Sequence, residues 1–148
     1  MIRVHGTSVA LGGEGILLRG PSGSGKSDLA LRLIDGGARL VADDQTELRR
    51  VKGTLMMRAP ATIAGCLEVR GVGILRVPNL PAAPLRLVVD LVAPDAVERL
   101  PEPAECALLG LSVPLLRLAP FEASAPAKLR LALGASVAAA PALFATAS

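Results

Sequence analysis

Eight consecutive residues near the amino terminus have the types and spacing needed to hold phosphate. They are Gly20, Pro21, Ser22, Gly23, Ser24, Gly25, Lys26 and Ser27, which fit the pattern G-x-x-x-x-G-K-[S/T]. Glycines let the backbone turn tightly and aim successive N–H groups at phosphate oxygens. Lys26 supplies an ammonium group for the terminal phosphates, and Ser27 supplies a hydroxyl for Mg²⁺. The segment therefore predicts a nucleotide-binding phosphate loop.

Two adjacent carboxylates, Asp43 and Asp44, end a short apolar run that follows this loop. On extended backbone, neighbouring side chains point to opposite faces. We therefore expect one acid to face the metal side and the other to face an incoming acceptor as general base. Asp90, inside the apolar run 85–92, is a rival for the metal carboxylate, and a plain strand-end turn is the alternative interpretation of the pair.

Three more polar residues are weaker candidates by type alone. His5 is the single histidine, Glu68 flanks a short apolar strand, and Arg99 sits in an acidic stretch. A histidine in a strand is more often packed or surface-exposed than catalytic. Arg99 equally fits a surface ion pair.

The elements that must position these residues are short. Apolar runs predict strands, Gly36-Gly37 ends a predicted helix, and a proline cluster at 78–84 predicts a linker. Strands outnumber helices, so the pattern indicates a mixed α/β class. The expected strands are 4–11, 16–19, 39–42, 47–52, 54–58, 66–69, 85–92 and 108–118, and the expected helices are 27–35 and one in the tail at 128–148.

Composition limits the classes of partner and the compartment. The chain has 148 residues, of which 51% are hydrophobic, so it fits one domain over 1–148 with its own core. The near absence of aromatic residues and a net charge of only +3 argue against a nucleic-acid partner. The sequence shows neither a secretory signal nor a strongly apolar span, so we expect a cytoplasmic protein without a membrane partner.

Four segments, taken in order, resemble the catalytic domain of bacterial HPr kinase/phosphorylase. They are 4–6, 20–27, 39–44 and 67–74. The resemblance implies an α/β P-loop kinase core with a mixed β-sheet, related to the phosphoenolpyruvate carboxykinase fold. It also implies ATP and Mg²⁺ as cofactors and transfer of the γ-phosphoryl group to a serine of HPr, a phosphocarrier protein. Family members are usually hexamers, so a homo-oligomer is expected.

The resemblance also implies roles for individual residues. The catalytic side chains carried over by motif are His5, Lys26, Asp43, Asp44 and Arg99. Asp44 takes the serine proton with Asp43 as its helper, and His5 lies by the transferred phosphate. The metal contacts are Ser27 and Glu68, and the whole segment 20–27 binds nucleotide.

Departures from the family pattern leave alternatives open. The chain starts directly at the catalytic core, like the short forms of alpha-proteobacteria. Where the family has an arginine-rich segment linked to phosphate-dependent dephosphorylation, this sequence offers only Arg117. The kinase direction is therefore expected ahead of the phosphorylase direction. The alternatives are a P-loop enzyme with a small-molecule acceptor and a non-catalytic nucleotide-binding regulatory module.

Overall fold

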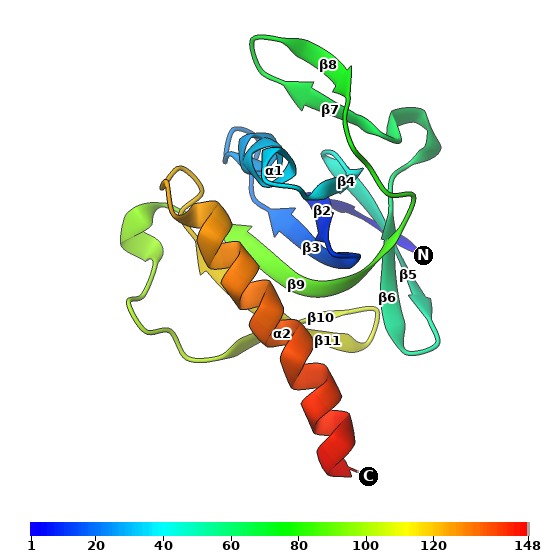
Figure 1. The fold of residues 1–148 in the computed structure, drawn as a ribbon, viewed down its shortest axis with the longest axis vertical. Helices are drawn as coiled ribbons and strands as arrows, with labels where there is room; N and C mark the ends of the chain where they lie inside the picture. Colours follow the sequence, from blue (N-terminus) through cyan, green and yellow to red (C-terminus); the bar gives the residue numbers. More distant parts are fainter. Residues whose placement is uncertain (148) are drawn as a thin grey trace.

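The computed structural model describes residues 1–147, with side chains described as far as residue 138. In this part of the chain, nine strands form one mixed sheet, two further strands form a separate hairpin, and two α-helices accompany them. Figure 1 shows this arrangement. The strands are β1 (Ile2–His5), β2 (Thr7–Leu11), β3 (Glu14–Arg19), β4 (Arg39–Ala42), β5 (Gln45–Val51), β6 (Thr54–Arg58), β7 (Cys66–Val69), β8 (Gly73–Arg76), β9 (Ala83–Leu91), β10 (Ala104–Leu108) and β11 (Leu111–Leu118). The helices are α1 (Lys26–Asp35), α2 (Ala125–Ala147) and the 3-10 turns η1 (Ala61–Ile63) and η2 (Pro94–Ala96).

Strand β9 is the centre of the sheet. It pairs in parallel with β3 and with β11, while its first residues pair antiparallel with β6. Strand β2 pairs antiparallel with both β3 and β4, so β4 runs in the same direction as β3. The carboxyl ends of β3, β4, β9 and β11 therefore point the same way. Loops that follow such ends are where open α/β sheets bind ligands.

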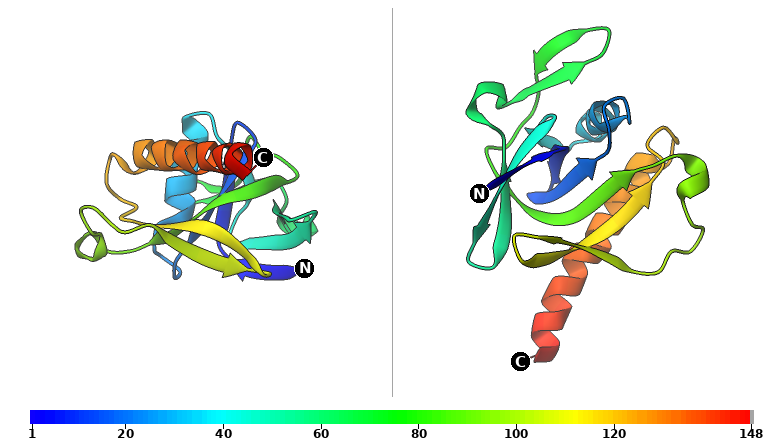
Figure 2. Two further views of the ribbon diagram at one scale, coloured as in Figure 1. Left: turned by 90° about the horizontal axis from the view of Figure 1, so that it is seen from below. Right: turned by 180° about the vertical axis from the view of Figure 1, so that it is seen from behind.

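Two apolar clusters fill the two faces of the sheet. One joins α1 and α2 to the sheet, and the other lies between the central strands and the β5–β6 hairpin. Neighbouring side chains of β3 point to opposite faces of the sheet, so Leu18 belongs to the first cluster and Leu17 to the second. Figure 2 shows both helices on one side of the central strands. Both faces of β3 are thus covered, which fixes the strand that leads into the phosphate loop.

Three of the sequence predictions differ from the structure. The predicted strand 4–11 is two strands, because β1 pairs with β5 whereas β2 pairs with β3 and β4. Between them, the backbone N–H of Gly6 donates to the Asp44 carbonyl at 2.8 Å. The predicted strand 108–118 is a hairpin that turns at Leu109 and Gly110, both with positive φ. The predicted linker is shorter than expected, because Pro84 already pairs with Met56 within β9.

The carboxyl-terminal part is helical. Helix α2 begins at Ala125, three residues before the predicted tail element, and residue 148 lies outside the described residues. Its first turns pack through Ala125, Leu129 and Leu133 against the cluster that also holds α1. Among the described residues, no helix is long and apolar enough to cross a membrane.

Candidate active site

The phosphate loop connects β3 directly to α1. Gly23 and Gly25 adopt positive φ angles of 83° and 100°, a conformation that L side chains rarely take. Gly25 is also the N-cap residue of α1, so the loop ends at a helix amino terminus. Exposed backbone N–H groups and the positive end of the helix dipole make this an anion-binding position.

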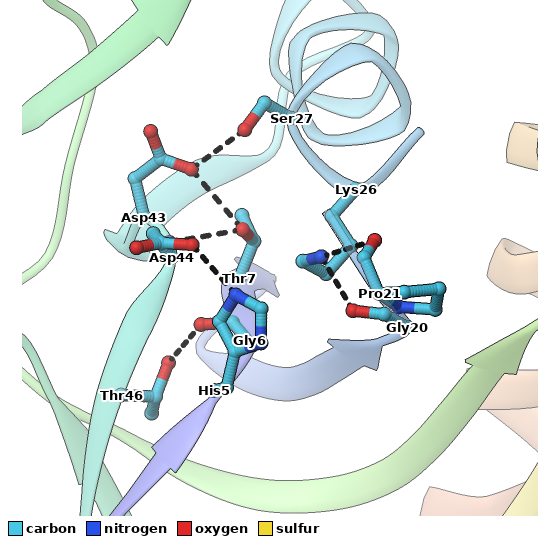
Figure 3. A network of polar contacts seen from close by, with 10 residues as sticks. All are labelled: His5, Gly6, Thr7, Gly20, Pro21, Lys26, Ser27, Asp43, Asp44 and Thr46. Atoms are coloured by element: carbon cyan, nitrogen blue, oxygen red, sulfur yellow. Dashed lines mark hydrogen bonds and ion pairs between the residues drawn. The ribbon is translucent and has the colours of Figure 1, made fainter. Parts of the chain in front are cut away.

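Lys26 is held inside the loop. The residue is only 6% exposed, and its Nζ donates to the carbonyl oxygens of Gly20 at 2.6 Å and Pro21 at 3.0 Å (Figure 3). These contacts use two of the three ammonium donors, and neither partner is a carboxylate. The positive charge at the start of α1 is therefore available to a phosphate.

Asp43 is the centre of a buried hydrogen-bond network. Its Oδ1 accepts from the hydroxyls of Ser27 at 2.8 Å and Thr7 at 3.1 Å, and its Oδ2 accepts from the backbone N–H of Glu68 at 3.0 Å. The carboxylate thus joins β2, α1, β4 and β7. Asp43 is 8% exposed, so the three donors replace the water that burial removes.

Asp44 contacts none of these donors through its side chain and lies next to His5 instead. The Nε2 atom of His5 lies 2.8 Å from Asp44 Oδ1, and both side chains are largely exposed (Figure 3). We expected extended backbone at this pair, but Asp44 has a φ of 65°. The turn is held by the Asp44 N–H, which donates to Thr7 Oγ1, and by the Asp44 carbonyl, which accepts from Gly6. The two carboxylates have different hydrogen-bond partners, and a left-handed residue stands where strand alternation was expected.

A cavity of about 690 Å³ lies in front of the phosphate loop. Lys26 and Ser27 line its floor, Asp44 and Glu68 line it with carboxylates, and the β7–β8 hairpin with its turn 70–72 forms one wall. Of the predicted residues, the structure therefore brings together the loop, the acid pair, His5 beside Asp44, and Glu68. A loop with the phosphate-binding motif, two carboxylates and a cavity of this size therefore lie in one place.

Comparison with known proteins decides the family. Residues 1–119 match the HPr Serine kinase C-terminal domain. This chain belongs to that family. The match covers the phosphate loop, the acid pair and the whole sheet, and it confirms the resemblance that the four sequence segments indicated.

Relatives in this family carry matching names. The chain is 50% identical to the HPr kinase/phosphorylase of Clostridium tetani over 78 residues, which are 53% of this chain and 26% of that protein. It is 46% identical to the HPr kinase/phosphorylase of Peptoclostridium acidaminophilum over 94 residues, which are 61% of this chain and 30% of that protein. The chain thus spans between about a quarter and a third of the length of these relatives.

A solved structure confirms the fold class. The Hpr(Ser) kinase/phosphatase from Coxiella burnetii superposes with a TM-score of 0.85 at 24% sequence identity, covering 99% of this chain and 96% of that chain. The predicted α/β core with a mixed sheet is therefore a fold that this chain shares with the Coxiella protein.

Asp90 and Arg99 lie apart from this cavity. Asp90 forms a two-bond ion pair with Arg19, at 2.7 and 3.1 Å, across the β3–β9 register. The pairing raises the pKa of Arg19 above its ordinary value, mainly through the hydrogen bond to Asp90. Arg99 is exposed between η2 and β10 and is not among the residues that line the cavity. Both carboxylate oxygens of Asp90 thus bind Arg19, the residue immediately before the phosphate loop.

Sequence reasoning missed two residues at the site. Thr7 places a fully buried hydroxyl between Asp43 and the Asp44 N–H, and Phe121 lines the cavity. Thr7 lies two residues after His5, so its closeness to a matched segment was a usable signal. Phe121 follows a strand end far along the chain, and no sequence pattern marked it.

Proposed function

We propose that this chain is an ATP-dependent protein kinase that phosphorylates a serine of an HPr-type phosphocarrier. One observation carries the proposal. The Ser27–Asp43 hydrogen bond joins the phosphate loop to the acid pair, and the neighbouring Asp44 opens into the same cavity. Membership of the HPr serine kinase family and relatives named HPr kinase/phosphorylase support the choice of acceptor.

The phosphate loop holds the triphosphate. Backbone N–H groups of 22–27 and the amino terminus of α1 bind phosphate oxygens, and Lys26 adds a compact positive charge. Positioning and charge neutralisation provide most of the rate enhancement in phosphoryl transfer. The rigid cradle around Lys26 supports this role, because little reorganisation is needed when substrate arrives.

The oxygen donors at the site fit Mg²⁺. The described residues contain no group of three or more His, Cys, Asp or Glu side chains that could hold an ion alone. Mg²⁺ favours one or two carboxylates together with substrate phosphates and water. Ser27, Asp43 and the exposed carboxylate of Glu68 are suitable partners around the cavity. When bound, Mg²⁺ neutralises charge on the phosphate oxygens.

Asp44 is the proposed general base. It is the acid of the pair that lines the cavity, whereas both oxygens of Asp43 already accept hydrogen bonds. His5 Nε2 donates a hydrogen bond that orients the Asp44 carboxylate. Because an ionised carboxylate can only accept, the proton must be on Nε2. Asp44 accepts the proton of the attacking serine hydroxyl and returns it in the reverse, phosphate-dependent reaction. This arrangement keeps His5 next to the transferred phosphoryl group.

Three parts of the proposal rest on the sequence alone, the first and third on the family resemblance and the second on the absence of a secretory signal. They are a homo-oligomer, a cytoplasmic location and a contribution of Arg99 to catalysis. Because Arg99 lies outside the cavity, its contribution requires movement of the 97–103 segment or a neighbouring subunit. Reversal by inorganic phosphate uses the same Asp44 and phosphate loop.

ATP consumption with and without acceptor separates the proposal from its alternatives. We expect ADP release only when HPr is present, and none when its phosphorylated serine is replaced by alanine. Rapid ADP release without any protein acceptor would indicate an NTPase or a small-molecule kinase. Tight ATP binding without transfer to HPr would indicate a regulatory binding module.

A further inference from the structure

Phe121 stands exposed at the edge of the phosphate loop. The residue is 69% exposed, although the preceding Ala119 and Pro120 are buried. Its ring lies against Gly25, because a Cβ atom added to Gly25 would be 2.9 Å from the ring atom Cζ. Phe121 also lines the 690 Å³ cavity. A large apolar ring is thus left uncovered beside the position where a nucleotide would bind.

Arg32 fixes the segment that carries this ring. Its guanidinium donates to the backbone carbonyl of Pro120 and, at 3.3 Å, to that of Glu122. The same group forms an ion pair with Asp28 at 3.0 Å, one turn earlier on α1. The carbonyl groups of the two residues on either side of Phe121 are therefore tied to the helix that follows the phosphate loop. The ring is exposed on a segment that is held in place.

The loop that carries Phe121 and the strand that precedes the acid pair lie on opposite sides of α1 (Figures 1 and 2). Strands β4 and β11 both end at the edge where the phosphate loop lies, and Figures 1 and 2 show the β11–α2 loop and β4 on opposite sides of α1. Asp44, just after β4, marks the side where the terminal phosphoryl group reacts. A triphosphate in the loop with its γ-phosphate toward Asp44 directs its nucleoside away from Asp44, toward the β11–α2 loop.

We propose that Phe121 is the platform on which the nucleobase stacks, with Arg32 as the positioning residue. This inference rests on the proposed function, because it assigns the base end of the same ATP site. A base stacks on an aromatic ring through dispersion and burial of apolar surface. Because every base has such a face, the platform binds purine nucleotides without selecting strongly among them. Phe121 contributes to binding of the base and leaves phosphate binding to the loop.

Comparison of ATP with a base-free polyphosphate tests the platform. Calorimetric titration of wild type and Phe121→Ala with Mg·ATP and with Mg·tripolyphosphate separates base from phosphate binding. We expect Phe121→Ala to weaken ATP binding roughly five- to hundredfold and tripolyphosphate binding by less than about twofold. The matched control is Leu131→Ala, which removes another exposed side chain, 76% exposed, away from the cavity. Unchanged ATP affinity, or equal losses for both ligands, would overturn the assignment.

A spectroscopic variant gives a second readout. The sequence contains no Trp or Tyr, so Phe121→Trp introduces a single indole at the proposed platform. We expect ATP to change the fluorescence of this indole and tripolyphosphate to leave it nearly constant, while Leu131→Trp responds to neither. Equal responses to both ligands would contradict stacking.

The calorimetric and the fluorescence measurements depend on nucleotide binding alone, not on phosphoryl transfer. A wild type that binds ATP without phosphorylating HPr would therefore refute the proposed function, while the contrast between ATP and tripolyphosphate would still support or overturn the role of Phe121.

Discussion

The Ser27 hydroxyl donates to Asp43 Oδ1 at 2.8 Å and links the first turn of α1 to the carboxyl end of β4. The same carboxylate accepts from Thr7 and from the Glu68 N–H. Phosphate loop, acid pair and β7–β8 hairpin are therefore one connected unit. Asp43 organises this unit, and Asp44 is left open for an acceptor.

Replacing Asp43 by alanine is expected to cost stability as well as activity. The change leaves the hydroxyls of Thr7 and Ser27 and the N–H of Glu68 without their acceptor, which we expect to lower the free energy of unfolding by about 2–4 kcal/mol. Urea unfolding measures this loss. Asp95→Ala, an exposed acid, is the control and should stay within about 0.5 kcal/mol of wild type. Equal stability of Asp43→Ala and wild type would contradict the organising role.

Asp44→Asn is expected to separate chemistry from folding and binding. The Asp44 side chain is 63% exposed, so the isosteric amide should leave unfolding nearly unchanged. Loss of the base should slow phosphoryl transfer by about 10²-fold or more. Single-turnover transfer to HPr and calorimetric ATP binding measure the two effects. A variant with full transfer activity would exclude Asp44 as the base.

Asp90→Asn tests whether the rival acid binds the metal. Asp90 pairs with Arg19 and does not line the cavity, so the change should cost about 1 kcal/mol of stability, limited by partial exposure of both groups. We expect the Mg²⁺ dependence of ATP binding to be unchanged. A large rise in the Mg²⁺ concentration needed for ATP binding would indicate that Asp90 takes part in metal binding.

Glu47 is expected to make the fold sensitive to acid. Hydrogen bonds from Arg3 and then Arg58 lower the pKa of Glu47 below its ordinary value of 4.5. The ionised form is favoured in the folded state, so this stability is fully present above about pH 4.5 and is lost as pH falls through the lowered pKa. Thermal unfolding between pH 3 and 6 should show a smaller pH dependence for Glu47→Gln than for wild type. Parallel curves would show that Glu47 does not carry the effect.

Local signals sufficed for the elements next to the phosphate loop. The apolar run before Gly20 and the helix ended by Gly36-Gly37 were predicted, because each has its own boundary residues. The division of 4–11 at Gly6 was not predicted, since it depends on a hydrogen bond to Asp44, far along the chain. The turn at Leu109 was missed because a leucine with positive φ has no sequence signal.

The site shows the same division between local and long-range information. The phosphate loop and the acid pair are contiguous motifs, so residue type and spacing identified them. Which acid of the pair does what depends on donors from β2, α1 and β7, and only the fold brings these together. Phe121 reaches the cavity because β11 runs parallel to β3 through β9, a pairing that sequence periodicity does not specify.

The most direct test of phosphoryl transfer to HPr is the intact mass of HPr after incubation with this protein, ATP and Mg²⁺. We expect a gain of about 80 Da on one serine, absent when Lys26→Ala replaces the wild type. Subsequent addition of inorganic phosphate tests reversal on the same sample. An unchanged HPr mass, under conditions where the wild-type protein binds ATP, would contradict phosphoryl transfer to HPr.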